Sequence, residues 1–284
     1  MKKSTQQSSK RDSQPDDILA TIIETTRADL ALWTPAPLVS GRTQISGRFR
    51  RALKEPNTVS IIAEFKKRSP SAGDIRPGAC PDEIARLYEQ NGAGAMSVLT
   101  DRRFFGGSLD DLAAVRRTTN LPLIRKDFMI DERQIDDAAA VGADAILLIV
   151  AALSDSDLRR LLAHSEKCRL DVLVEAHDGA ELTRALRLDA TVIGINNRNL
   201  KTMKTDIETG IRLAETIPAS RRDSIALVAE SGLKTHSDIQ KIADAGFDAA
   251  LIGETLMASP DVGAALASFT GGKKRASPRA TTSF

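Results

Sequence analysis

The sequence has few cysteines and few aromatic residues, and both shortages narrow the class of protein. Cys80 and Cys168 are its two cysteines, and their spacing matches no metal-binding or redox motif. Two isolated thiols suit a reducing compartment better than a disulfide-stapled secreted fold. No spacing of histidine, cysteine and carboxylates resembles a metal centre either, so we predict no metal. Aromatic residues make up 4% of the chain, and the core must consist mainly of Ala, Ile, Leu and Val.

The net charge is also small, and its distribution argues against a nucleic-acid partner. The formal charge of the whole chain is +2. Residues 1–14 carry four basic residues and one acidic residue, and residues 271–284 carry four basic ones, which leaves the body between them with a charge of −5. A nucleic-acid binder is expected to carry its basic patch on the fold itself. We therefore predict a small-molecule partner and no nucleic acid.

Long hydrophobic segments are missing as well. The longest apolar run extends from Ala145 to Leu153, which is nine residues, whereas a membrane-spanning helix needs ~18 or more. The chain starts with Met1-Lys2-Lys3 and then turns polar, without the apolar core of a signal peptide. These patterns predict a cytoplasmic protein with no membrane partner.

What the chain does contain is a regular alternation. Eight short runs rich in Val, Ile and Leu begin near residues 59, 95, 122, 144, 171, 191, 225 and 248, and each is followed by a longer segment with helical periodicity. The runs are continuously apolar, as in parallel strands that are buried on both faces. This alternation, without a glycine-rich dinucleotide-binding motif, favours an α/β fold of the (β/α)8 TIM-barrel type, for which 284 residues is an ordinary length.

The segments outside this alternation define the domain organisation. Apolar residues between Asp16 and Trp33 recur at helical spacing and predict an extra N-terminal helical segment outside the barrel repeat. Residues 1–14 and 271–284 are polar and basic, with too little apolar surface to offset the entropy lost on ordering. We predict a single domain over residues 15–270, flanked by two disordered tails.

The carboxyl ends of the predicted strands are rich in charged and amide side chains. The active site of a (β/α)8 barrel lies at these ends, so their side chains should share one mouth. A single charge there could equally be a solvated strand terminus or an ion pair that closes the barrel. Six of the eight ends carry such groups, and desolvating so many charges in one mouth is costly, which favours a functional site. They are Glu64 and Lys66, Lys126, Glu175, Asn196 and Arg198, Glu230, and Glu254.

Small residues follow the last two strands. Ser231-Gly232 and Gly253 allow a close approach of the backbone, and loops at these positions commonly bind phosphate in this fold. The glycines could instead serve tight turns alone. With the cations of Lys66 and Arg198 in the same mouth, the pattern favours a sugar-phosphate ligand.

At these residues the chain closely resembles the indole-3-glycerol phosphate synthase family of tryptophan biosynthesis. The matching segments occur in the family's order from about residue 15 to 270. The most diagnostic one is Ile62-Ala-Glu64-Phe-Lys66-Lys-Arg-Ser69-Pro70-Ser71. The others are Phe104-Phe105-Gly106-Gly107-Ser108, Arg125-Lys126-Asp127-Phe128, Val174-Glu175-Ala-His177, Ile195-Asn196-Asn197-Arg198-Asn199-Leu200, Ala229-Glu230-Ser231-Gly232 and Ile252-Gly253-Glu254.

The resemblance implies a carbon–carbon lyase that closes the indole ring of 1-(2-carboxyphenylamino)-1-deoxyribulose 5-phosphate, with loss of CO₂ and water. It implies no cofactor, and it assigns roles to individual residues. Lys126 would be the acid that protonates a developing alkoxide. Glu175 and Glu64 would transfer protons in later steps, in an order that is left open, and Lys66 would act as an acid or as an anchor for an anionic end of the substrate. Glu230 and Asn196 would orient these groups and the substrate hydroxyls. The implied substrate and phosphate positions are Ser69, Arg198, Glu230, Ser231, Gly232, Gly253 and Glu254.

The aromatic part of the implied substrate needs an apolar wall. Phe105, Phe128 and Leu148 are the candidates, with core packing as the alternative for Leu148. The chain departs from the family's pattern at residues 76–80, at Arg133 and at Met203. These departures are expected to affect loop closure or ligand affinity more than the reaction.

Two rival functions stay open. Another phosphate-binding barrel enzyme, such as an isomerase or an aldolase that forms a Schiff base at Lys126, would keep the fold and change the reaction. A non-catalytic barrel with its tails as docking arms is disfavoured, because the implied catalytic set is intact. The sequence leaves the oligomeric state open between monomer and homodimer.

The three histidines are expected to have structural positions. His177 closely follows Glu175 and could act as a base, but a cap on the next helix is favoured. His164 and His236 lie in helical patterns and are expected on the surface.

Overall fold

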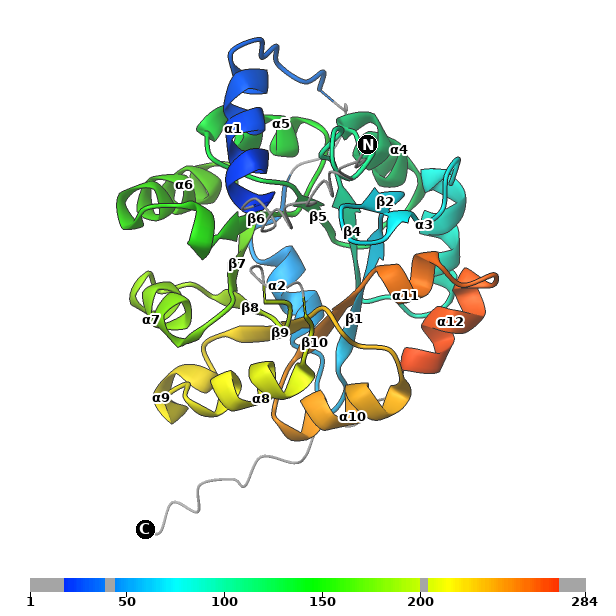
Figure 1. Ribbon diagram of the computed structural model, residues 1–284, viewed down its shortest axis with the longest axis vertical. Coiled ribbons are helices and arrows are strands. Elements are labelled where there is room, and N and C mark those ends of the chain that lie inside the picture. Colours follow the sequence, from blue (N-terminus) through cyan, green and yellow to red (C-terminus); the bar gives the residue numbers. More distant parts are fainter. Residues whose placement is uncertain (1–17, 39–43, 200–203, 271–284) are drawn as a thin grey trace, which may run out of the picture.

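A computed structural model describes residues 18–38, 44–199 and 204–270. Eight parallel strands form a closed barrel in the order β1-β10-β9-β8-β7-β6-β5-β4, and β4 pairs with β1 to complete the ring (Figure 1). The predicted (β/α)8 barrel is confirmed. The strands are β1 (Ser60–Phe65), β4 (Ala95–Leu99), β5 (Leu123–Lys126), β6 (Ala145–Ile149), β7 (Asp171–Ala176), β8 (Val192–Asn196), β9 (Ala226–Glu230) and β10 (Ala249–Ile252).

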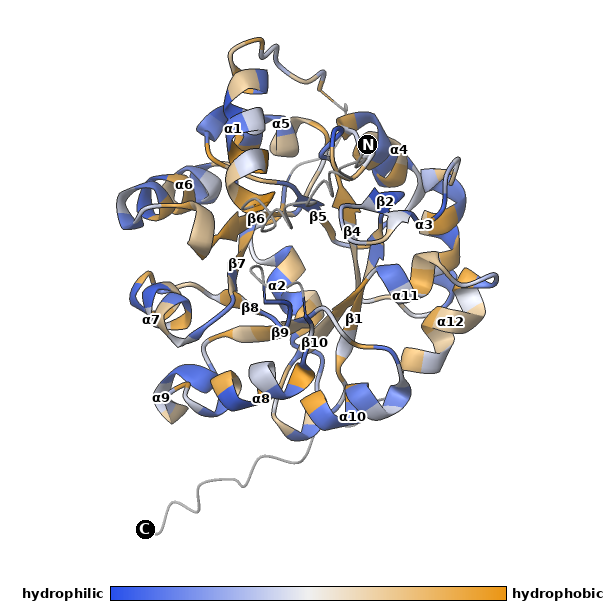
Figure 2. Ribbon diagram, in the orientation of Figure 1, coloured by the Kyte–Doolittle hydropathy of each residue, from blue (hydrophilic) through white to orange (hydrophobic). Residues whose placement is uncertain are grey.

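Helices follow the strands and surround the barrel (Figure 1). Figure 2 shows mostly apolar strands and helices whose outer faces are polar. The loop after β1 also forms a two-stranded antiparallel sheet of β2 (Arg68–Ser69) and β3 (Gly73–Asp74). The helices after β1 are α3 (Pro81–Gln90), α4 (Leu109–Thr118), α5 (Glu132–Ala140), the 3₁₀ turn η1 (Val150–Ala152), α6 (Asp155–Lys167), α7 (Gly179–Arg187), α8 (Ile207–Glu215), α9 (Ala219–Arg222), α10 (His236–Asp244), α11 (Glu254–Met257) and α12 (Val262–Phe269).

Each strand is buried on both faces, because successive side chains point into the barrel and out toward the helices. In β1, Ile61, Ala63 and Phe65 belong to the outer apolar cluster, whereas Ile62 belongs to the inner one. The same alternation runs through the other strands, and the inner cluster includes Ala95, Ile124, Leu147, Leu173, Val192, Val228 and Leu251. Within each strand, alternate residues therefore lie on opposite sides of the barrel wall.

The N-terminal segment contributes two helices. α1 (Ile18–Leu30) fulfils the predicted helix between Asp16 and Trp33. α2 (Arg48–Leu53) inserts Phe49 and Leu53, both fully buried, into the inner cluster and so closes one end of the barrel. The candidate site lies at the opposite end of the barrel, where the strands have their carboxyl ends.

The predicted tails, residues 1–14 and 271–284, lie outside the described residues, as does Met203. Within the described ranges no helix has both the length and the apolarity needed to cross a membrane.

Candidate active site

The inward positions of five strands bring the predicted catalytic side chains into one mouth. Glu64, Lys126, Glu175, Asn196 and Glu230 share the parity of the inner apolar residues on their strands. They line a cavity of about 620 Å³ at the carboxyl ends of the strands. Of the fifteen site residues predicted from the sequence, the cavity lining lacks Leu148 and includes the following: Glu64, Lys66, Ser69, Phe105, Lys126, Phe128, Glu175, Asn196, Arg198, Glu230, Ser231, Gly232, Gly253 and Glu254.

Lys126 stands at the centre of the charged groups. Its Nζ lies 3.5 Å from Oε2 of Glu175 and 3.3 Å from Oε2 of Glu230. The side chain of Lys126 is 15% exposed, and those of the two glutamates are 4% and 1% exposed. Burial lowers the pKa of Lys126, but the carboxylates of Glu230, Glu175 and Glu64 outweigh it and raise the pKa above its ordinary value. Lys126 is thus an ammonium held at the end of β5.

Arg125, the residue before Lys126 in β5, holds the end of this strand in place through hydrogen bonds. Its guanidinium donates to Asp127 (2.8 Å), to the hydroxyl of Thr100 (3.0 Å) and to the carbonyl of Gln134 (2.7 Å). Arg125 is 5% exposed, so these hydrogen bonds satisfy a charge that would otherwise be costly to bury. This network pins the strand from which Lys126 projects.

A second ion pair lies beside the first. Nζ of Lys66 is 3.1 Å from Oε1 of Glu64, and the hydroxyl of Ser97 donates to Oε2 of the same carboxylate at 3.3 Å. Lys66 follows the end of β1 and keeps a 12% exposed side chain, so its ammonium faces the cavity. The two groups of ion pairs bring Lys126 and Lys66 together with the carboxyl groups of Glu175, Glu230 and Glu64.

Crowding of the carboxylates separates their pKa values. Burial and the nearby Glu175 carboxylate raise the pKa of Glu230 to about 8, against a smaller opposing effect of Lys126. For Glu175, burial raises the pKa, but Lys126, His177 and Asn196 together bring it well below the ordinary value. The two acids titrate as one coupled system. At neutral pH Glu230 is therefore mainly protonated, and Glu175 is ionised.

His177 has a larger part in the site than the sequence suggested. Its Nε2 lies 3.1 Å from Oε1 of Glu175, and its Nδ1 lies 2.9 Å from Oε2 of Glu181 in α7. Burial lowers the pKa of His177, but hydrogen bonds with the two glutamates raise it to about 10. The ring is therefore an imidazolium at neutral pH, which disfavours the general-base interpretation. His177 thus bridges Glu175 to Glu181 of α7, and the predicted helix-cap role was wrong, because Asp178 is the N-cap of α7.

We expect Glu230→Gln to change the pH dependence of stability. A carboxyl whose pKa is about 8 when folded holds a proton that the unfolded chain loses at about pH 4.5, so the stability it contributes falls as pH rises between those values. Glutamine cannot ionise. Urea unfolding at about pH 5 and pH 8.5 should therefore show the variant gaining stability over the wild type at the higher pH. Glu254→Gln, at an exposed position, is the control, and an equal difference at both pH values would contradict the assignment.

The other side of the mouth is built from backbone. Ser231 and Gly232 both have positive φ, 65° and 83°, so the chain turns sharply after β9. Gly253 immediately follows β10 and precedes the short helix α11. Backbone amides at such turns can bind a phosphate. The side chain of Glu254 is half exposed, which keeps its carboxylate out of the buried charge cluster.

Arg198 links this side to the loop after β1. Its NH1 donates to Oγ of Ser71 at 2.7 Å, and that hydroxyl lies 3.3 Å from Oγ of Ser69. Oδ1 of Asn196 accepts from the backbone N–H of Arg198 (3.0 Å), while its Nδ2 donates to Glu175 (3.1 Å). One amide thus connects the cationic edge of the mouth to the acid–base cluster.

The backbone at Gly253 also lies very close to the catalytic cluster. A Cβ built there would lie 2.3 Å from Oε1 and 3.0 Å from Cβ of Glu64. We therefore expect Gly253→Ala to displace Glu64 and lower kcat by about 10–100-fold, because small misplacements of reacting groups are expensive. Gly179→Ala is the matched control, since its nearest neighbour is 3.8 Å away, and it should leave steady-state kinetics unchanged. Equal activities of the two variants would exclude this packing role.

The apolar wall differs from the prediction in one residue. The rings of Phe105 and Phe128 lie with centroids 5.9 Å apart at the cavity. Leu148, however, is fully buried in the outer cluster, so the prediction of a wall role was wrong and the packing alternative holds. Its neighbours Leu147 and Ile149 line the cavity instead, because alternate residues of β6 point inward.

Sequence reasoning also missed two groups of lining residues. The predicted N-terminal helix was not connected with the site, yet Ile18, Leu19 and Ile22 of α1 lie at the cavity. Lys234 adds a further cation two residues after Gly232. Its position next to the predicted phosphate turn was the signal that could have identified it.

Arg133 helps hold α1 over the mouth. Its NH1 donates to the carbonyl of Leu30 at 3.1 Å, and its guanidinium lies 5.4 Å from the ring centroid of Trp33. Trp33 in turn donates from Nε1 to Asp137 at 2.8 Å. Arg133, one of the positions at which the chain departs from the family's pattern, thus attaches the N-terminal segment to the barrel.

Comparison with known proteins places this geometry in a family. The family model described as indole-3-glycerol phosphate synthase matches residues 23–269. The chain belongs to the indole-3-glycerol phosphate synthase family. The resemblance seen in the sequence is therefore confirmed from Ile23 in α1 to Phe269 at the end of α12.

Individual relatives agree with this assignment. The indole-3-glycerol phosphate synthase of Chlorobium chlorochromatii is 51% identical over 216 residues, which covers 75% of this chain and 82% of that protein. The indole-3-glycerol phosphate synthase of Albidiferax ferrireducens is 42% identical over 260 residues, which covers 88% of this chain and 97% of that protein.

Solved structures of other proteins share the fold. The 3-hexulose-6-phosphate synthase from Salmonella typhimurium aligns with a TM-score of 0.59 at 8% identity, over 74% of this chain and 96% of that one. The thiamine phosphate pyrophosphorylase from Pyrococcus furiosus aligns with a TM-score of 0.55 at 15% identity, over 74% and 93%. At such low identity the likeness concerns the fold alone.

Proposed function

We propose that the chain converts 1-(2-carboxyphenylamino)-1-deoxyribulose 5-phosphate into indole-3-glycerol phosphate, with release of CO₂ and water. The family membership supports this reaction. The observation that carries it is the buried Lys126 ammonium, within 3.5 Å of Glu175 and 3.3 Å of Glu230, in a cavity with one apolar and one phosphate-compatible side.

The cavity offers a separate place for each part of this substrate. The phosphate binds backbone amides of Ser231, Gly232 and Gly253, with Arg198 as the nearby cation. The aminophenyl ring packs against Phe105 and Phe128, whose rings are at contact distance from each other. Lys66, whose ammonium faces the cavity, pairs with the ring carboxylate. This arrangement places the ketone carbon between the two ends, next to Lys126.

Ring closure is the step that needs an acid. The ring carbon that bears the carboxylate attacks the ketone carbon, so a carbon–carbon bond forms as the carbonyl π bond becomes an alkoxide. Lys126 donates its proton to that oxygen, and its positive charge stabilises the developing negative charge before transfer. Loss of CO₂ then returns the bonding electrons to the ring and restores its aromaticity.

Dehydration completes the indole. The new hydroxyl leaves as water, with its proton supplied from the acid–base cluster, and the neighbouring CH₂ carbon gives up one proton to form the double bond. Glu175 and Glu64 are the proton acceptors and donors of these steps. Glu175 is ionised at neutral pH, since its pKa lies below the ordinary value, so it is in the form that can accept a proton. Asn196 and Glu230 orient Glu175 and Lys126 through their direct contacts.

The test is direct turnover of the carboxyphenylamino sugar phosphate by the purified full chain. Formation of indole fluorescence, together with one CO₂ per turnover, is the expected result. Borohydride added during turnover should trap no adduct at Lys126. Trapping of a Schiff base without indole formation would instead identify the aldolase alternative, and the absence of both signals would contradict the proposed reaction.

Three finer statements accompany this function. We propose that the enzyme works in the reducing cytoplasm, which both free thiols, Cys80 and Cys168, would suit, and that it binds no nucleic acid.

Residues 15–270 form the catalytic unit in this proposal. Deletion of residues 1–14 and 271–284 should therefore leave turnover unchanged, and a loss of activity would make the tails part of the enzyme.

A further inference from the structure

Three potential metal ligands of different types meet on the outside of the barrel, between α5 and α6. Asp136 belongs to α5, His164 belongs to α6, and Cys168 is the residue at the C-terminal end of α6. His164 and Cys168 are four residues apart, so they occupy the same face of the helix. Sequence analysis predicted no metal site, because the third donor comes from another helix and the pair alone matched no motif.

The three donor atoms are already close together. Nε2 of His164 lies 2.7 Å from Oδ1 of Asp136, and Sγ of Cys168 lies 3.6 Å from the same oxygen. One ligand atom from each residue lies within 4.8 Å of the others. The side chain of His164 is 20% exposed and that of Asp136 is 55% exposed, so an ion can reach them from solvent.

These distances suit a small tetrahedral cation. Zinc bonds of ~2.0 Å to oxygen and nitrogen and ~2.3 Å to sulfur imply ligand separations of roughly 3.3 Å between N and O and 3.5 Å between S and O. The observed separation of Sγ and Oδ1, 3.6 Å, already fits. The separation of Nε2 and Oδ1 must widen from 2.7 Å by about half an ångström, which side-chain rotation can supply. Imidazole, thiolate and carboxylate together are typical zinc ligands.

We propose that Asp136, His164 and Cys168 bind one zinc ion, with water in the fourth position. The Cys168 thiol releases its proton to solvent as the Zn–S bond forms. The ion joins α5 to the C-terminal end of α6 on the outside of the barrel, and none of its three ligands lines the active-site cavity. It is thus separate from the proposed reaction, and it strengthens the contact between two neighbouring helices.

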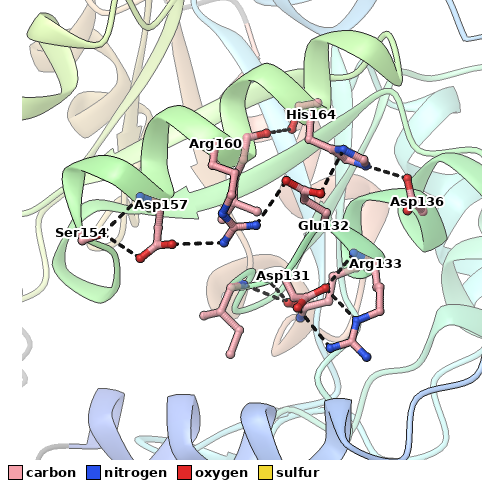
Figure 3. A network of polar contacts seen from close by, with 12 residues as sticks. Asp131, Glu132, Arg133, Asp136, Ser154, Asp157, Arg160 and His164 are labelled. Atoms are coloured by element: carbon pink, nitrogen blue, oxygen red, sulfur yellow. Dashed lines mark hydrogen bonds and ion pairs between the residues drawn. The ribbon is translucent and has the colours of Figure 1, made fainter.

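A fourth residue orients the histidine. Oε2 of Glu132 lies 3.6 Å from Nδ1 of His164, and Glu132 is itself paired with Arg160 at 3.3 Å (Figure 3). A carboxylate behind the non-ligating nitrogen fixes the ring and its tautomer in many zinc sites. Figure 3 shows Glu132 and Asp136 approaching the His164 ring from two sides, so Nε2 remains the nitrogen that faces Asp136.

Cobalt substitution tests the proposal on the untagged full chain. Co²⁺ should bind with a stoichiometry of one per chain and give the near-ultraviolet absorption of a sulfur-to-cobalt charge transfer, and Zn²⁺ should displace it. Cys168→Ser should abolish the absorption, and His164→Gln should weaken zinc binding at least tenfold. Cys80→Ser is the matched control, because Cys80 is the exposed cysteine near α3, and it should bind as the wild type does.

Activity and stability complete the experiment. Zinc at about 100 times its Kd should raise the Tm of the wild type by roughly 5 °C and should not raise that of Cys168→Ser. Since none of these residues lines the active-site cavity, all three variants should keep the wild-type kcat. A cobalt complex without the charge-transfer absorption, or equal zinc affinity in wild type and Cys168→Ser, would overturn the site.

Discussion

Lys126→Ala should lower kcat by about 10²–10⁴-fold, the usual contribution of a positioned general acid, while the protein stays folded. The ammonium pairs with two buried carboxyl groups of the mouth, Glu175 at 3.5 Å and Glu230 at 3.3 Å. Removing it deletes both the proton donor and the positive charge that opposes the developing alkoxide. The measurement is kcat and KM by indole fluorescence, with circular dichroism to show that the barrel is intact.

Lys126→Arg separates the two roles of the lysine. Arginine retains the positive charge but cannot serve as a proton donor near neutral pH, so its kcat should also fall by at least about 10²-fold if proton donation dominates. Lys54→Ala is the control, because Lys54 also pairs with a carboxylate, Asp248, at 3.6 Å but lies outside the cavity lining. A wild-type kcat in Lys126→Ala would remove this residue from the mechanism.

The barrel itself was predictable from local pattern. Continuous apolar runs such as Ala145–Ile149 can be satisfied only where both faces of a strand are covered, and eight of them in alternation with helices leave few other topologies. The rule that barrel active sites lie at the carboxyl ends of the strands then predicts that Glu64, Lys126 and Glu175 lie together. Their charges were visible in the sequence because strand ends are where polar residues interrupt the apolar runs.

Other features depended on information that a local pattern does not contain. Leu148 was misassigned because β6 is apolar on both faces, so nothing in Leu147-Leu148-Ile149 reveals which side points inward. The position of α1 over the mouth depends on long-range contacts such as that of Arg133 with Leu30. The same holds for Asp136, whose approach to His164 follows from helix packing.

Glu175→Gln is the second variant with a large expected effect. Oε2 of Glu175 faces Lys126 at 3.5 Å, while Oε1 faces Asn196 and His177, each at 3.1 Å. Glutamine keeps the size of the side chain but cannot accept a proton, so kcat should fall by about 10²–10³-fold, with a smaller change in KM. Because the change leaves Lys126 and His177 with less compensation in a buried site, the variant's Tm must be compared with that of the wild type.

The losses of kcat in Glu175→Gln and Glu64→Gln show which of the two carboxylates contributes more to proton transfer. Glu64 pairs with Lys66 at 3.1 Å and with Ser97 at 3.3 Å, whereas Glu175 contacts the proposed acid itself and has a pKa below the ordinary value. The larger loss of kcat is therefore expected for Glu175→Gln. Glu181→Gln is the control, since Glu181 contacts His177 but does not line the cavity, and its effect should stay within a few-fold. A larger loss in Glu64→Gln would reassign the principal proton transfer to Glu64, which pairs with Lys66.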